Sequence, residues 1–373
     1  MRFLIRLLLV AGGLAGIFAV TLAGGLRQGL LALLGIGFGA VLQGARFGFT
    51  TGWRDYIERR DPQGLWAQML LLVLAAALTL PLIAGNPGEL VGAVAPLTIS
   101  LVLGAFLFGA AMQLADGCGS GTLYKAGGGA PISFAVLPTF AIGSFLGASH
   151  QPAWIALGGL PPVDMLRYGW PVALGITVVG CGLVSWFAAR GARKHPTANA
   201  TADTAPSAGL VWSRRWWIGA LLLAVLYALH LVVAGQPWGI VYGIGLWGAK
   251  LVAALGWSPV GDAFWGVDPH AVRLAEPVLA DVTSVTNFGL IYGALAASRW
   301  NGPADFRVPS PKRLIAGAVA GLVMGYSARM AFGCNVGAFL GGIASASLHG
   351  WVWFALAFAG SILGVRIRRR VGA

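Results

Sequence analysis

Residues 114–129 read LADGCGSGTLYKAGGG, and residues 328–342 read ARMAFGCNVGAFLGG. Both segments contain the pattern Gly-Cys-x-x-Gly, and an offset of 216 residues aligns Cys118 with Cys334 and Gly121 with Gly337. An apolar stretch precedes and follows each copy. The repeated pattern therefore predicts a chain of two related halves, each interrupted by a glycine-rich break that carries a cysteine.

The composition places both copies in a membrane protein. Hydrophobic residues make up 57% of the 373 residues and charged residues only 10%, which is too little charge to cover a water-soluble protein of this size. Apolar runs of 18 or more residues recur along the chain, as expected for transmembrane helices. We therefore predict an all-α polytopic membrane protein with re-entrant or half-membrane helices at the two breaks.

The net charge of +13 does not indicate nucleic-acid binding, because the basic residues lie between the apolar runs. The positive-inside rule places such loops in the cytoplasm. The clusters are Arg54, Arg59 and Arg60; Arg190, Arg193, Lys194, Arg214 and Arg215; Arg299, Arg307, Lys312 and Arg313; and Arg366, Arg368, Arg369 and Arg370. They predict a multi-pass membrane protein with both termini in the cytoplasm. They also predict that the two halves are inverted and pseudo-symmetric, which is a recurring transporter design.

The chain divides into four predicted segments. Residues 1–28 form an additional N-terminal helix that acts as a signal anchor, and residues 29–190 form the first membrane half. Residues 191–215, rich in Ala, Thr and Pro, form a cytoplasmic linker. Residues 216–373 form the second membrane half, which ends in a basic cytoplasmic tail.

No cofactor or metal site is predicted. The three cysteines include no Cys-x-x-Cys pair, and the five histidines show no ligand spacing. The chain also has neither a Walker sequence nor a Gly-x-Gly-x-x-Gly fingerprint. Transport would therefore run on a gradient or on later consumption of the cargo.

The breaks have a chemistry that suits an anion. Glycine is unfavourable inside a helix by about 1 kcal/mol relative to alanine, so each break is expected to end one helix and start a half-helix. The N-terminus of a half-helix presents free N–H groups and partial positive charge, and a neutral cysteine adds a weak S–H donor. The predicted substrate path at the two breaks comprises Gly117, Cys118, Gly119, Gly121, Gly333, Cys334, Asn335 and Gly337.

Several polar residues have competing interpretations. Arg46, with Gln43 one turn before it, either belongs to the substrate path or reaches to the cytoplasmic interface, where we also place Arg54 and Asp55. Lys125 is interpreted as a marker of the cytoplasmic side. Asn335 either caps the backbone or contacts substrate. Arg329, five residues before Cys334, is expected to be functional or paired, with Asp281 and Glu276 as candidate partners.

The chain resembles the YeeE/YedE sulfur-transport family in three segments: GFGAVLQGARFGFTTGWRD (37–55), LADGCGSGTLYKAGGG (114–129) and YSARMAFGCNVGAFLGGIASASLHGW (326–351). The resemblance extends from about residue 29 to residue 365. It implies an hourglass-like protein of the bacterial inner membrane with inverted halves, in which thiosulfate passes between cysteines by S–H hydrogen bonds. Cys118 and Cys334 match two family cysteines. Gly48 stands where the family has a third, and Cys181, in the middle of a predicted helix, is interpreted as a packing residue.

The leading hypothesis is thus a permease, with no catalytic residues, for thiosulfate or a related small sulfur anion. Alternatives are a transporter of a selenium species or of sulfide, a membrane sulfurtransferase that forms a cysteine persulfide, and a neutral-solute channel. The expected partners are the sulfur anion and the lipid bilayer. The sequence leaves open whether a cytoplasmic sulfur carrier or a rhodanese receives the cargo.

Overall fold

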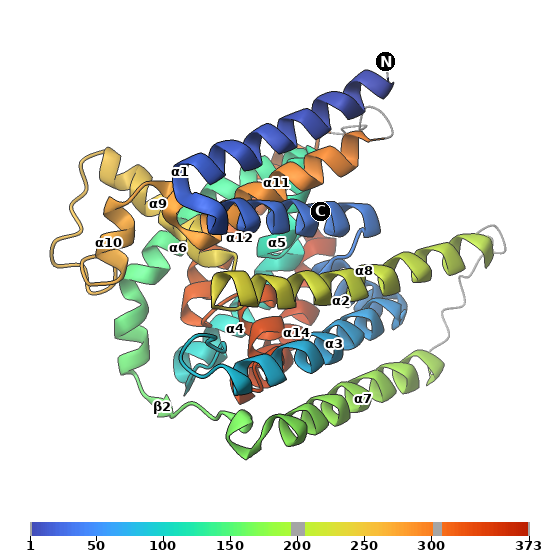
Figure 1. The fold of residues 1–373 in the computed structure, drawn as a ribbon. Helices are drawn as coiled ribbons and strands as arrows, with labels where there is room; N and C mark the ends of the chain where they lie inside the picture. Colours follow the sequence, from blue (N-terminus) through green and yellow to red (C-terminus); the bar gives the residue numbers. More distant parts are fainter. Residues whose placement is uncertain (1, 195–205, 301–307, 372–373) are drawn as a thin grey trace.

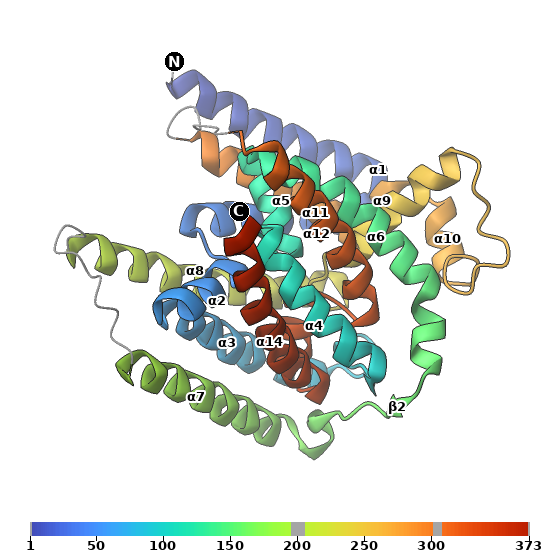
Figure 2. The ribbon, with the colours of Figure 1, turned by 180° about the vertical axis from the view of Figure 1, so that it is seen from behind.

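The computed structural model describes residues 2–194, 206–300 and 308–371, without the side chains of 193, 194 and 206–213. In this part of the chain almost all of the secondary structure is helical (Figures 1 and 2). In chain order the α-helices are α1 (Arg2–Ala45), α2 (Phe49–Arg59), α3 (Gln63–Gly85), α4 (Ile99–Leu114), α5 (Gly119–Gly128), α6 (Pro131–Ala156), α7 (Trp170–Lys194), α8 (Pro206–Ala234), α9 (Val241–Ala254), α10 (His270–Ala275), α11 (Val282–Arg299), α12 (Pro311–Met330), α13 (Gly341–Ala344) and α14 (Leu348–Val371).

Shorter elements complete the fold. They are the 3-10 helices η1 (Met165–Tyr168) and η2 (Val278–Ala280), the π-helical turn η3 (Asn335–Leu340), and the strands β1 (Leu97–Thr98) and β2 (Gly159–Leu160), which pair antiparallel. Eight helical segments of the described chain are long and apolar enough to cross a membrane. The predicted all-α, multi-pass architecture is therefore confirmed.

Helix α1 is two arms joined at Gly25, whose backbone (φ 82°, ψ 177°) is not helical. Only glycine adopts this conformation without strain. The first arm packs on α11, where the Tyr292 hydroxyl donates to the Leu9 carbonyl at 2.6 Å. Figure 1 shows the second arm folding back beside it. The turn lies just before residue 28, where the N-terminal segment was predicted to end.

Glycines bring the second arm of α1 into backbone contact with α11. A Cβ atom on Gly35 or Gly39 would collide with backbone atoms of Thr286 or Leu290 in α11. Gly289 and Gly293 of α11 are equally close to the backbone of α1. Two Gly-x-x-x-Gly faces thus pack against each other, a common way to associate helices in lipid. Helices α6 and α12 pack in the same way through Gly143, Gly147, Gly321 and Gly325.

The predicted linker between the two predicted membrane halves is helical at both of its ends. Helix α7 runs to Lys194 and α8 begins at Pro206, so both helices extend into the segment that we predicted as a loop. Residues 195–205 of that segment lie outside the described residues.

The bundle has two distinct sides. The N-terminal end of α1, the C-terminal end of α14 and the ends of α7 and α8 that flank residues 195–205 lie towards one side, which we call the terminal side (Figures 1 and 2). The segment that contains α10 lies at the opposite side, which we call the α10 side.

Candidate functional site

Both cysteine motifs fold into the break that the sequence predicts. Cys118 is the N-cap of α5 with φ −83° and ψ −167°, and Cys334 is the N-cap of η3 with φ −103° and ψ −165°. Two residues before each cysteine, Asp116 (φ 59°) and Phe332 (φ 58°) have left-handed backbones. This conformation is uncommon for any residue except glycine, and for a bulky side chain it marks strain.

The hydrogen bonds of the two breaks repeat with the same 216-residue offset. The amide of Gly117 donates to Met112 O at 3.1 Å, and that of Gly333 to Ala328 O at 2.8 Å. The carbonyl of each cysteine accepts a hydrogen bond from the amide of the residue four positions later. This residue is Thr122 for Cys118 and Ala338 for Cys334, and the distance is 2.8 Å in both cases. The sequence repeat therefore encodes a repeat of local backbone geometry. The copies differ after the cysteine, where α5 is regular and η3 is a π-helical turn, a feature frequent at functional sites.

A third break of the same kind, which sequence reasoning missed, separates α1 from α2. Arg46 has a left-handed backbone (φ 49°), and the amide of Phe47 donates to Leu42 O at 3.0 Å. Gly48 then caps α2, and its carbonyl accepts from Gly52 N at 3.1 Å. The available signal was the four-residue glycine spacing Gly44, Gly48 and Gly52. No cysteine stands at this break.

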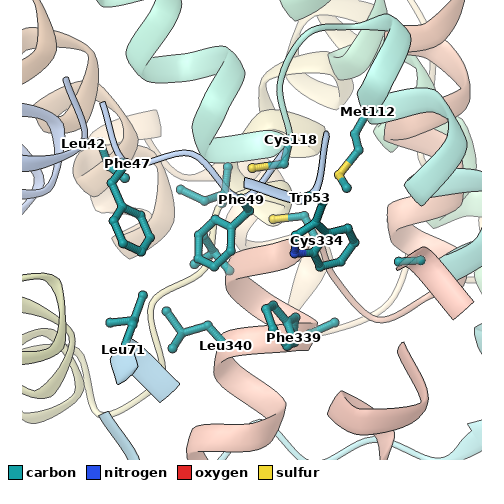
Figure 3. Close-up of a cluster of buried hydrophobic side chains, with 14 of the residues drawn as sticks. Leu42, Phe47, Phe49, Trp53, Leu71, Met112, Cys118, Cys334, Phe339 and Leu340 are labelled. Atoms are coloured by element: carbon teal, nitrogen blue, oxygen red, sulfur yellow. The ribbon is translucent and has the colours of Figure 1, made fainter. Parts of the chain in front are cut away.

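The fold brings the two thiols together. Cys118 is 2% exposed and Cys334 is fully buried. A Cβ atom on Gly119 would lie 3.1 Å from the Cys334 sulfur, so this glycine lets the start of α5 approach the second cysteine. Figure 3 shows both side chains beside Phe49 and Trp53 in an apolar surround. The described conformation is closed around the thiols.

A narrow cleft of about 10 Å³, which is about the space of one water molecule, adjoins Cys118. It is lined by Phe47, Gly48, Phe49, Thr50, Thr51, Asp116, Gly117, Cys118, Ser120, Gly121, Tyr124 and Lys125. The starts of α2 and α5 therefore meet in one space, and the first-turn amides of both helices have no acceptor within their own helix. Two helix N-termini at one cleft create a partial positive charge that favours an anion.

A charged cluster joins three helices next to this cleft. The Asp116 carboxylate pairs with Arg54 of α2 at 2.8 Å, Lys125 of α5 at 2.9 Å and Arg368 of α14 at 3.2 Å. Arg54 and Lys125 are therefore ion-paired beside the cleft, and their position at the cytoplasmic interface stays a prediction. Sequence reasoning missed Asp116, although a carboxylate inside an apolar stretch next to the cysteine motif was a signal.

Arg329 lies in an aromatic surround towards the α10 side. Its guanidinium carbon is 4.7 Å from the centre of the Phe264 ring and 5.7 Å from that of Tyr242. Its buried Nε has no hydrogen-bond partner among the described residues. The expected carboxylate partners were wrong, because neither Asp281 nor Glu276 pairs with Arg329 in the described part of the chain.

A second guanidinium completes this cluster. The Arg273 carbon lies 5.3 Å from the centre of the same Tyr242 ring. Asp281 caps α11 through Ser284 N at 2.7 Å and is 3.9 Å from Arg273. The Tyr242 hydroxyl is 3.0 Å from His270 Nδ1. Burial and the nearby arginines lower the pKa of His270 to about 4, so the two guanidiniums carry the positive charge at neutral pH.

Asn335 follows Cys334 and is fully buried. Neither its Oδ1 nor its Nδ2 has a hydrogen-bond partner within the described residues, so the alternative of backbone capping is wrong. Burying an amide without partners is unfavourable by roughly 1–3 kcal/mol. A buried donor that no protein group satisfies, next to a thiol, is a candidate contact for a ligand.

The remaining predicted residues lie in different surroundings. Gln43 packs on the end of α5, where its Oε1 would be 3.1 Å from a Cβ atom on Gly128, and Arg46 is exposed. Gly333 has φ 148°, which requires glycine, whereas nothing crowds Gly337. Cys181 is buried in α7 and borders an open apolar groove with Trp66 and Met69, and the lining of this groove includes no residue of the two motifs.

Comparison with known proteins gives concordant results. The family described as sulphur transport matches residues 44–363. A thiosulfate transporter TsuA of Spirochaeta thermophila is 28% identical over 335 residues, which cover 86% of this chain and 92% of the relative. A thiosulfate transporter TsuA of Escherichia coli is 22% identical over 343 residues, 88% of this chain and 89% of the relative. A probable transporter YedE of Escherichia coli is 31% identical over 160 residues, 42% of this chain and 39% of the relative.

Proposed function

The chain belongs to the sulphur-transport family, and on that basis we propose that it is an inner-membrane permease for thiosulfate or a related small sulfur anion. It is a transporter and not an enzyme. The observation that carries the proposal is the convergence of two duplicated breaks, which bring Cys118 and Cys334 together in the interior of a helical membrane protein. We place the terminal side in the cytoplasm and the α10 side outside it.

In this proposal the thiols act as neutral hydrogen-bond donors. A thiolate in the apolar surround of Cys334 would be an unpaired buried charge, and it would repel an anionic substrate. Neutral S–H groups bind weakly, and weak binding suits conduction because each site must also release its ligand. The anion passes from Cys334 and Asn335 to Cys118. Gly117, Gly119, Gly121, Gly333 and Gly337 keep the backbone close to this path.

Passage requires movement at the breaks, because the thiols are closed off in the described conformation. The left-handed Phe332 and the π-helical turn after Cys334 are the strained elements that would move. Beyond Cys118 the anion reaches the cleft at Gly48 and then the basic terminal side, near Arg46 and Gln43. A cytoplasmic sulfur carrier or a rhodanese would receive it there.

The test is growth of a bacterium that cannot take up thiosulfate, supplied with thiosulfate as its only sulfur source. Expression of this protein is expected to restore growth and the uptake of radiolabelled thiosulfate. An inactive but well-expressed and correctly inserted protein would contradict the proposal. In that case the same cells supplied with selenite or sulfide would test the alternative cargoes.

Arg329 and Arg273 are proposed to capture the anion on the α10 side. Arg329→Gln removes a guanidinium that no carboxylate neutralises in the described structure. Loss of a charged hydrogen bond of about 1.5 kcal/mol is expected to raise the apparent KM for thiosulfate roughly tenfold while leaving the maximal rate nearly unchanged. Arg167→Gln is the matched control, because Arg167 also stacks on an aromatic ring, Tyr168, at 4.7 Å. Equal KM values for the two variants would contradict a capture role.

Asn335→Ala is expected to lower thiosulfate uptake without lowering the stability of the protein. The side chain has no partner in the described protein, so its removal relieves a desolvation penalty and should leave the unfolding temperature unchanged or higher. Thiosulfate uptake should fall roughly tenfold, because one donor to the anion is lost. Asn287→Ala is the control, since the equally buried Asn287 donates to Ile240 O at 3.0 Å and its loss should reduce stability. Unchanged uptake by Asn335→Ala would remove this residue from the path.

A further inference from the structure

The break before α2 has no thiol, but it has a buried hydroxyl without a partner. Thr50 is 3% exposed, and no acceptor or donor lies within reach of its Oγ1 among the described residues. Buried threonines elsewhere in the protein donate to the carbonyl four residues earlier, as Thr122 does to Cys118 and Thr177 to Ala173. For Thr50 that carbonyl belongs to Arg46, whose left-handed backbone lies outside the helix.

Thr50 stands in the position that Ser120 has at the break of Cys118. Both are the second residue of their half-helix, and both line the cleft. The Ser120 hydroxyl lies 3.4 Å from the Cys118 sulfur and is thereby partnered. Because Gly48 has no side chain, the Thr50 hydroxyl has no such neighbour and remains available to a ligand.

A second hydroxyl reaches the same space from α5. Tyr124 is 6% exposed and lines the cleft. Its hydroxyl oxygen would lie 3.5 Å from a Cβ atom on Gly48, so it occupies the region in front of this glycine. Among the described residues that line the cleft, the one carboxylate is that of Asp116, and it is paired with three cations. The cleft therefore presents hydroxyl donors and the N-termini of two helices without an uncompensated negative charge.

We propose that the hydroxyls of Thr50 and Tyr124, together with the first-turn amides of α2, form an oxyanion site on the terminal side of Cys118. This inference rests on the proposed function and narrows its substrate class. A hydroxyl is a stronger donor to oxygen than a thiol is, so the site binds the oxygen atoms of thiosulfate. Sulfide has no oxygen and gains nothing from it. The chain therefore selects small sulfur oxyanions over sulfide.

The test measures binding of radiolabelled thiosulfate to the purified full-length protein and its uptake into proteoliposomes. Thr50→Val and Tyr124→Phe are each expected to raise the Kd for thiosulfate roughly tenfold, the effect of one hydrogen bond to an anion. Thr177→Val is the matched control, since it removes a buried helical hydroxyl in α7. Sulfide uptake should be equal in all four proteins. Wild-type affinity in both Thr50→Val and Tyr124→Phe would overturn the inference.

A rescue variant separates a binding role from a structural one. Gly48 has ordinary extended backbone (φ −127°), and a Cβ atom there would meet nothing closer than the Thr51 hydroxyl at 3.2 Å. Gly48→Cys combined with Thr50→Val should restore at least part of the lost affinity by supplying a new donor, and failure to restore any would count against the site. If the wild type itself transports no thiosulfate, the proposed function fails. If the wild type transports thiosulfate and Thr50→Val and Tyr124→Phe both bind it with wild-type affinity, only the inference of an oxyanion site fails.

Discussion

Cys118→Ala and Cys334→Ala are each expected to lower thiosulfate uptake roughly 10- to 100-fold, the effect of losing a hydrogen bond to a charged group of about 1.5–3 kcal/mol. Both side chains are buried at the starts of half-helices, and a Cβ atom on Gly119 of α5 would lie 3.1 Å from the Cys334 sulfur. In the proposed path both thiols lie on the same route, so loss of the donor at either position interrupts it. The measurement is uptake of radiolabelled thiosulfate by cells with equal amounts of each variant in the membrane.

Cys181→Ala is the internal control for this prediction. Cys181 is as buried as Cys118, but it lies in α7 and borders an apolar groove whose lining includes no residue of the two motifs. Its replacement should leave uptake within about twofold of wild type, because small-to-small changes in a core are well tolerated. Cys118→Ser keeps a donor of similar size and should retain more activity than Cys118→Ala. Full activity of the double variant Cys118→Ala and Cys334→Ala would exclude the thiol path and favour a neutral-solute channel.

Asp116→Asn is expected to destabilise the protein by about 3 kcal/mol, because removal of one partner from a largely buried ion-pair network leaves the other charges uncompensated. Three cations from α2, α5 and α14 converge on this carboxylate, and its side chain is only 18% exposed. The neutral amide would leave Arg54, Lys125 and Arg368 to repel one another. Thermal unfolding of the purified protein should therefore begin several degrees lower.

Two further variants test the origin of that effect. Asp55→Asn, on α2, removes a carboxylate that pairs only loosely with the exposed Arg59 at 4.0 Å, so it should change stability by less than about 1 kcal/mol. Arg368→Gln added to Asp116→Asn should recover part of the loss, since one uncompensated cation is removed. Equal stability of Asp116→Asn and the wild type would mean that the cluster does not hold α14 to the cleft.

The sequence was sufficient for the features that depend on local composition. Hydropathy predicts the helical membrane fold, because every backbone group in lipid must be satisfied within a helix. The spacing of glycines predicts the two breaks, and Cys118 and Cys334 are the N-caps of the elements that follow. The third break, at Gly48, was hidden because the apolar run continues past Arg46 to Phe49 and a left-handed residue leaves no mark in hydropathy.

Only the tertiary structure decided which distant groups share a site. The sequence placed Cys118 and Cys334 in equivalent positions, but the approach of the start of α5 to Cys334 depends on how distant helices pack. Arg329 was expected to be functional or paired, with Asp281 and Glu276 as candidate partners, and it faces Phe264 and Tyr242 of other segments. Such contacts join residues that are far apart in the chain, and their energies depend on burial and direction. Local patterns determine where a helix breaks, and packing determines what each break faces.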